Sequence, residues 1–269
     1  MKPPSNKNHD IEKEDENVGD REIIRNDIDL ASVQSALAQC TKIYEDRGIK
    51  IPLIEGAVCI EDFLRPEPQD LLESRAWASG NPDDASALEK VYRTARTGFG
   101  DNEVNITRAD QQIPMLADLK GEMNVFLKEL FGKEPTYHSF ELRALTPKSS
   151  GHSRHVDYAA GYTIRTDHET GHPYALVPVS LSLPISWNDG RAPTFVVEGV
   201  HRGKDAEGKR IEESTLRMEQ NRPGSLAIFG PTMYHTHPPT TDFDKPYLWL
   251  VTQAYFRYYQ NATPKDGAR

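Results

Sequence analysis

The chain of 269 residues contains 37% hydrophobic and 27% charged residues, and it has a formal net charge of −9 at pH 7. This length suffices to bury a large core, and the acidic balance argues against a nucleic-acid-binding protein, which would present a basic face. No apolar stretch approaches 18 residues and the N-terminus lacks an apolar h-region, so we expect a cytoplasmic protein with no membrane partner.

Residues 1–27 form an acidic segment with few large apolar side chains. Because such a segment cannot bury enough apolar surface to offset the entropy lost on ordering, we expect a disordered tail. Asp29 is expected to cap a first helix that ends at Gly48. The apolar residues of this helix recur at helical spacing: Leu30, Val33, Leu37, Cys40 and Tyr44.

Two short strands are expected next, at 49–54 and 57–60. Further helices are expected at 68–77, 84–95 and 113–131. The only two cysteines, Cys40 and Cys59, lie within apolar patterns. We expect two buried, reduced thiols rather than a disulfide, as in a cytosolic protein.

From residue 135 onward the chain consists of runs rich in β-branched and aromatic residues, separated by Gly, Pro, Asn and Asp turns. These runs predict strands at 137–145, 161–165, 175–187, 194–198, 225–229 and 247–258. Strands at this spacing suit a sandwich or barrel. We therefore expect one α+β, mainly β domain over 28–269, in which a helical buttress (28–134) supports a β-barrel core (135–260).

Two metal-binding patterns lie within residues 151–172, GHSRHVDYAAGYTIRTDHETGH. The second, HETGH at 168–172, has the letters of the zinc-protease motif H-E-x-x-H, which needs a helix to bring both histidines to one face. Gly171 within the motif and Pro173 after it oppose a helix. We expect the polar tip of a hairpin there instead.

The first pattern, His155-Val156-Asp157, needs no helix. In an extended segment the residues i and i+2 point to the same side, so a His and an Asp can chelate one metal ion. The alternative is a surface ion pair near a turn. A metal site requires a third ligand from another strand, and the candidates are His235 and His237.

The segment that carries these histidines reads Pro-Gly-Ser-Leu-Ala-Ile-Phe over 223–229, with His235 six residues after the Phe and Lys245 ten residues further on. With His155-x-Asp157, this order resembles the Fe(II)/2-oxoglutarate-dependent oxygenases, in particular their phytanoyl-CoA hydroxylase-like branch and nearby small-molecule hydroxylases. Residues 187–203 resemble a second element of that branch, whose histidine, here His201, is not an iron ligand.

The resemblance implies a double-stranded β-helix, which is a jelly-roll or cupin-like barrel. It implies that His155, Asp157 and His235 are the catalytic iron ligands and that Lys245, in place of the commoner Arg, pairs with the far carboxylate of 2-oxoglutarate. Arg143 and Arg257 are fallback anchors for this carboxylate. The cofactors implied are Fe(II), 2-oxoglutarate as co-substrate, and O₂.

The resemblance further implies hydroxylation of an unactivated C–H bond in a small metabolite, with release of succinate and CO₂. The carboxylate of Asp157 distinguishes the chain from related halogenases, which have a small residue there. We expect a substrate that carries a carboxylate, such as an amino-acid derivative. The candidate substrate-binding residues are Arg143, Tyr158, Arg96 and Thr252, with Arg93 beside Arg96.

Two other functions stay open at this point. One is a zinc metallohydrolase that uses His168, Glu169 and His172. The other is a non-catalytic β-barrel binding protein in which the histidines only pack or bridge strands. The sequence predicts a small-molecule partner and leaves the oligomeric state open.

Overall fold

The computed structural model describes residues 24–77, 92, 95–97, 103–145, 151–186, 194–204, 207, 210–237 and 247–260. At 95–97, 200–204, 210–215 and 237 it describes the backbone alone. Residues 1–23 of the predicted tail (1–27) lie outside these residues, as does most of the predicted helix at 84–95. The last four residues of the predicted tail are described, and there Ile24 is buried and Arg25 forms an antiparallel bridge with Leu64.

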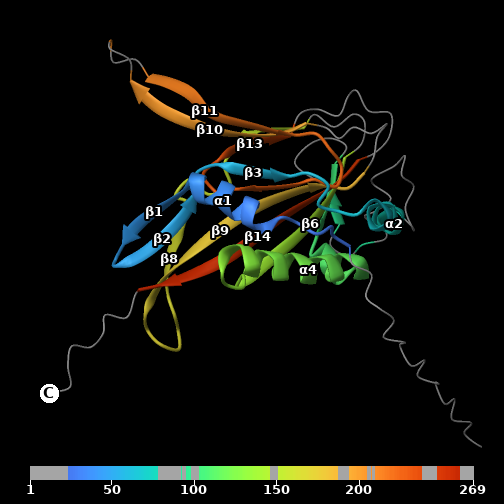
Figure 1. The fold of residues 1–269 in the computed structure, drawn as a ribbon, viewed down its shortest axis with the longest axis horizontal. Helices are drawn as coiled ribbons and strands as arrows, with labels where there is room; N and C mark the ends of the chain where they lie inside the picture. Colours follow the sequence, from blue (N-terminus) through green and yellow to red (C-terminus); the bar gives the residue numbers. More distant parts are fainter. Residues whose placement is uncertain are drawn as a thin grey trace, which may run out of the picture.

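Two antiparallel sheets form the body of the protein (Figure 1). The first has the strand order β3 (Ala57–Ile60), β12 (Leu226–Phe229), β9 (Pro173–Pro184), β14 (Tyr247–Tyr259), β6 (Tyr137–Leu145), β5 (Glu103–Thr107) and β4 (Ala95–Thr97), and β8 (Thr163–Thr166) pairs with β9. The second has the order β11 (Arg210–Gln220), β10 (Phe195–Lys204), β13 (Tyr234–His237) and β7 (His152–His155).

From β6 onward the chain crosses repeatedly between these sheets. Strands β6, β9, β12 and β14 belong to the first sheet, and β7, β10, β11 and β13 belong to the second. All of the pairings are antiparallel. This connectivity is that of a jelly-roll-like fold, as the family resemblance implied.

A buried apolar cluster lies between the sheets. It contains Phe195 and Val197 of β10, Phe229 of β12, and Tyr247 and Trp249 of β14. A larger cluster lies on the other face of the first sheet and includes residues of the helices. The two faces of the first sheet are therefore both covered, which explains why β9 is buried without interruption from residue 177 to residue 184.

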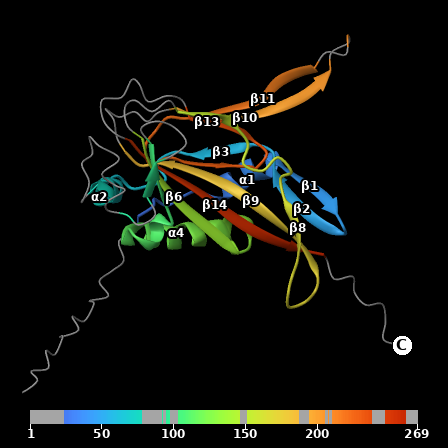
Figure 2. The ribbon, with the colours of Figure 1, turned by 180° about the vertical axis from the view of Figure 1, so that it is seen from behind.

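The described helices are α1 (Leu30–Cys40), α2 (Pro66–Trp77) and α4 (Pro114–Phe131), with a 3-10 helix, η2, at Ala109–Gln111. Helix α4 begins with a proline at its first position and ends at Gly132, whose φ of 70° suits glycine. Figures 1 and 2 show α4 running beneath β6 and β14. Phe131 of α4 packs on Phe256 of β14, with ring centroids 5.0 Å apart.

The first helix is shorter than predicted. The Asp29 side chain accepts a hydrogen bond from the Ser32 amide as the expected cap, but α1 ends at Cys40 and Tyr44 lies in β1 (Thr41–Asp46). Strand β1 pairs with β2 (Ile49–Ile54), and the connecting residues Arg47 and Gly48 have φ of 52° and 73°. Gly48 is therefore a hairpin residue and not a helix stop, because two-residue hairpins favour positive φ.

The N-terminal half is also less helical than predicted. Strand β3 pairs with β12, and β4 and β5 extend the first sheet beyond β6. Ala95, predicted at the end of a helix, lies in β4. The sequence pattern also missed β11, whose charged residues suit the sheet edge. Within the described residues, no helix is both long and apolar enough to cross a membrane.

Candidate metal centre

The second sheet brings two of the predicted ligands together. Strands β7 and β13 pair antiparallel, and their register places His155 opposite His235. The two ring centroids lie 4.2 Å apart. Directly opposed residues on an antiparallel ladder project to the same face, and both imidazoles line one cavity between the sheets.

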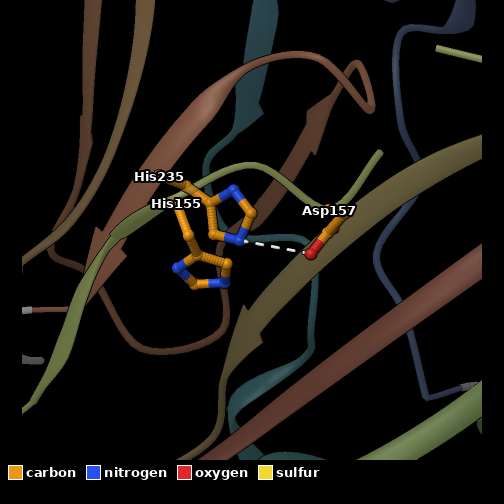
Figure 3. Close-up of side chains that lie close together, drawn as sticks. All are labelled: His155, Asp157 and His235. Carbon is orange, nitrogen blue, oxygen red and sulfur yellow. Dashed lines mark ion pairs between the residues drawn. The ribbon is translucent and has the colours of Figure 1, made fainter. Parts of the chain in front are cut away.

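Asp157 joins them from the loop that follows β7. Its Oδ1 lies 3.6 Å from Nε2 of His235. One ligand atom from each of His155, Asp157 and His235 lies within 4.8 Å of the others, and Figure 3 shows the three side chains facing one another. No other group of three His, Cys, Asp or Glu side chains in the described part of the chain has this geometry.

Main-chain carbonyl groups orient both imidazoles in the same way. Nδ1 of His155 is 2.8 Å from the carbonyl oxygen of Ser153, and Nδ1 of His235 is 3.3 Å from that of Met233. A carbonyl oxygen only accepts hydrogen bonds, so each Nδ1 carries the proton and donates it. In the neutral imidazole with this tautomer, Nε2 keeps its lone pair, which is the form that binds a metal ion.

A hydroxyl group orients the carboxylate. Oγ of Ser180, on β9, donates a hydrogen bond of 2.7 Å to Oδ2 of Asp157. Ser180 is 1% exposed. Because Oδ2 is held by the first sheet, Oδ1 is the oxygen that faces His235 in the second sheet. The metal-binding arrangement thus depends on both sheets.

His235 is in an environment that keeps it neutral. Burial lowers the pKa of His235, and the nearby carboxylate of Asp157 opposes this shift only in part. The rings of Phe195 and Phe229 pack beside it, with centroid distances of 5.8 Å and 5.1 Å. A neutral imidazole is ready to bind a cation without first losing a proton.

The three side chains open into a cavity between the sheets. It is lined by polar and apolar residues of β6, β7, β9, β10, β12 and β14 in addition to Asp157 and His235: Ser139, Glu141, Arg143, His152, His155, Leu181, Ser182, Phe195, Phe229, Trp249, Val251, Thr252 and Gln253. Phe195 and Phe229 lie beside His235, and the charged members Glu141 and Arg143 lie on β6. The cavity can therefore hold a molecule that has both apolar and charged parts.

Arg143 is the cavity-lining cation among the described residues, and it lies in a network. Its Nε donates to Glu141 at 2.8 Å, and its Nη1 is 3.0 Å from Nδ1 of His152. Nε2 of His152 lies 2.5 Å from Oε2 of Glu103. The Glu103 side chain is fully buried, and its Oε1 has no hydrogen-bond partner, although Arg143 Nη1 is 3.9 Å away.

The other predicted substrate-binding residues lie in different surroundings. Thr252 lines the cavity, but its hydroxyl group is 3.0 Å from Nε2 of buried His138 on the opposite face of the sheet. Tyr158 lies outside the described lining, and its hydroxyl group is 2.5 Å from that of Tyr255. For Arg96 the structure describes only the backbone, in β4.

The structure describes only some of the residues that were predicted to anchor 2-oxoglutarate or the substrate. Lys245 and Arg93 lie outside the described residues. Arg257 is remote from the cavity lining, and its Nη1 is 3.8 Å from Asp167. His237 is placed by its backbone opposite His152, and His201 by its backbone in β10.

The HETGH segment is a turn, as predicted. Strands β8 and β9 form a hairpin, and Asp167 Oδ1 accepts hydrogen bonds from the amides of Glu169 and Thr170 at its tip. His168, Glu169 and His172 are all exposed and are not helical. This geometry does not favour the zinc hydrolase.

Three residues of the site were not predicted from the sequence: His152, Glu103 and Ser180. Ser180 could have been suspected, since a hydroxyl group within the apolar run of β9 must find a hydrogen-bond partner when buried. Glu103 has no comparable signal, because its strand, β5, was not predicted at all. His152 lies three residues before His155, a spacing that does not suggest a shared face in a strand.

The chain matches no protein-family model and no curated protein. It is similar to several solved structures. The structure of the non-heme alpha ketoglutarate dependent epimerase SnoN from nogalamycin biosynthesis matches at 15% identity and a TM-score of 0.50, over 89% of this chain and 92% of that chain. This likeness shows that the two chains share a fold.

Two further structures are similar at lower TM-scores. A Pseudomonas putida prolyl-4-hydroxylase has 15% identity and a TM-score of 0.47, over 86% of this chain and 98% of that chain. The EctD of S. alaskensis, solved with 2-oxoglutarate and 5-hydroxyectoine, has 20% identity and a TM-score of 0.48, over 74% of this chain and 72% of that chain.

Proposed function

We propose that the protein is a non-haem Fe(II)- and 2-oxoglutarate-dependent dioxygenase that hydroxylates an unactivated C–H bond of a small metabolite. The observation that carries this proposal is the convergence of two imidazoles and one carboxylate on a cavity of a jelly-roll-like fold. The reaction consumes the substrate, O₂ and 2-oxoglutarate and yields the hydroxylated substrate, succinate and CO₂.

The donor atoms fit ferrous iron. Two imidazole nitrogens and one carboxylate oxygen on one side of a metal ion leave positions open for a co-substrate and O₂, which is the ligand set of non-haem iron oxygenases. His155 and His235 would each supply Nε2, and Asp157 would supply Oδ1. When bound, iron together with 2-oxoglutarate and O₂ supplies the oxidising power for the cleavage of the C–H bond.

The residues around the site have complementary tasks in this proposal. Ser180 holds Asp157 in place, and Phe195 and Phe229 exclude water from the metal-binding side of the cavity. We assign the far carboxylate of 2-oxoglutarate to Lys245, whose ammonium group can pair with one carboxylate oxygen. Lys245→Ala is then expected to raise the KM for 2-oxoglutarate more than the KM for the substrate.

The substrate-binding wall is assigned to β6, with Arg143 as its charged centre. The hydroxyl groups of Thr252 and Tyr158 are engaged by His138 and Tyr255, so we assign neither of them a direct hydrogen bond to the substrate. Arg96 remains a candidate for a substrate carboxylate. The presence of Asp157 supports hydroxylation over halogenation. Helices α1 and α4 serve as a buttress for the first sheet in this assignment.

The proposal is tested by anaerobic addition of Fe(II) and 2-oxoglutarate to the whole protein. We expect the weak visible charge-transfer band of the iron chelate, followed by succinate release when O₂ is admitted. Asp157→Ala is expected to abolish both signals. Glu169→Ala, in the exposed turn, is the matched control and should retain both. Absence of the band in the wild-type protein would refute the proposal.

A further inference from the structure

The register of three neighbouring strands orders the cavity wall into three rungs. Ser139 of β6 lies opposite Gln253 of β14, which lies opposite Ser180 of β9, the residue that holds Asp157. Two residues further along β6, Glu141 begins the second rung. Two residues beyond it, Arg143 begins the third. The wall therefore runs from the metal-binding end to a charged end.

The strand spacing gives the scale of this wall. Two residues along a strand span roughly 7 Å, and two strand separations span roughly 10 Å. Glu141 is one rung along and two strands across from Ser180. The carboxylate of Glu141 and the metal-binding group can thus contact opposite ends of one small molecule.

The positive charge of Arg143 is already balanced by neighbouring side chains in this wall. Its Nε and Nη1 groups are used by Glu141 and His152, and Glu103 lies on its other side. Its guanidinium group also lies over the ring of Trp249, at 5.4 Å from the centroid. A carboxylate of a substrate that bound Arg143 would have to compete with these partners.

Two carboxylates, Glu103 and Glu141, face the single guanidinium group of Arg143. Glu103 is fully buried and cannot reach a ligand, whereas the Glu141 side chain is 30% exposed and lines the cavity. Oε1 of Glu141 accepts the hydrogen bond from Arg143, and no described residue donates to its Oε2. The acceptor that is left open to a ligand is therefore a carboxylate oxygen.

On the basis of the proposed function, we propose that Glu141 binds a positively charged nitrogen of the substrate. The substrate is then an amine- or guanidine-bearing metabolite whose hydrocarbon part lies beside Phe195 and Phe229, near the metal-binding group. Arg143 is a positioning residue that fixes the rotamer of Glu141, and Glu103 and His152 in turn hold Arg143. An amino-acid derivative meets this requirement through its ammonium group.

The test compares molecules that share a carbon skeleton. Primary amines of five to eight carbons and the matching alcohols and carboxylates are added to the protein loaded with Fe(II) and 2-oxoglutarate. Their binding is followed anaerobically by the change in the charge-transfer band, and their turnover by succinate release. We expect each amine to bind more tightly than its alcohol and its carboxylate.

Glu141→Gln keeps the shape of the side chain and removes its charge. It is expected to weaken amine binding about ten- to a hundredfold, since a hydrogen bond between two charged groups is lost. Binding of the alcohols should change little. Glu134→Gln, at an exposed site where Glu134 pairs with Lys128, is the matched control and should leave amine binding unchanged.

The outcomes separate this inference from the proposed function. A panel in which no amine binds better than its alcohol, or in which Glu141→Gln leaves the preference unchanged, overturns the inference while the charge-transfer band still supports the oxygenase. Absence of the band in the unsubstituted protein overturns the proposed function itself. A preference for amines that is lost only in Glu141→Gln supports the inference.

Discussion

Buried His138 makes the stability of the protein depend on pH, and the substitution His138→Gln isolates this effect. Its Nδ1 lies 2.7 Å from Oδ1 of Asn124 on α4, and its Nε2 lies 3.0 Å from Oγ1 of Thr252 on β14. The histidine therefore joins the helix to the first sheet in its neutral form. Burial, with a smaller effect from Lys120, lowers the pKa of His138 from 6.5 to about 3.

The sign and size of the effect follow from these two pKa values. Above pH 7 the imidazole is neutral in both the folded and the unfolded chain. As the pH falls below 6.5 the unfolded chain takes up a proton, whereas the folded protein does not until about pH 3. The free energy of unfolding therefore falls by about 1.4 kcal/mol per pH unit within this window, or about 2 kcal/mol between pH 7.5 and pH 5.0.

Urea denaturation of the wild-type protein and of His138→Gln at both pH values measures this difference. The substitution should cost about 1–3 kcal/mol at pH 7.5, because one glutamine cannot satisfy both Asn124 and Thr252. Its cost should shrink by about 2 kcal/mol at pH 5.0, since the wild-type protein alone loses the contribution of the neutral histidine. Other titrating groups cancel in the difference. An equal cost at both pH values would refute the reasoning.

Three further predictions concern single contacts. Ser180→Ala should weaken Fe(II) binding about 10- to 100-fold, because Asp157 loses the donor that orients it, and Ser180→Thr should restore part of the affinity, as measured by metal titration. Gly230→Ala should cost about 3 kcal/mol or more in denaturation experiments, since a Cβ atom there would lie 1.6 Å from the carbonyl oxygen of Ile54. Gly121→Ala, at an exposed position of α4 where the added Cβ would have nothing within 4 Å, should instead stabilise the protein by about 1 kcal/mol.

Local patterns in the sequence were sufficient to predict several helices, strands and turns. Strand β6 begins and ends where its alternating pattern predicted, and the apolar spacing of 113–131 gave helix α4 to within one residue. The turn at 168–172 followed from Gly171 and Pro173. These elements are determined by residues a few positions apart, so the chain's own periodicity and turn residues specify them.

The same reasoning failed where a distant partner decides the conformation. The apolar spacing around Tyr44 suits a helix, yet pairing with β2 makes the segment a strand. Strands β4 and β5 are likewise formed through pairing, β4 with β5 and β5 with β6. Pairing between strands compensates for weak local preferences, and local sequence cannot report it.

For the site, residue types and spacing were enough to predict the candidate metal ligands and their order along the chain: His155 and Asp157 two apart in an extended segment, and a later histidine. Only the folded chain shows that His155 stands opposite His235, that Ser180 reaches Asp157, and that Arg143 lies near buried Glu103. These contacts depend on strand register across two sheets, where a shift of one residue would turn each side chain to the other face.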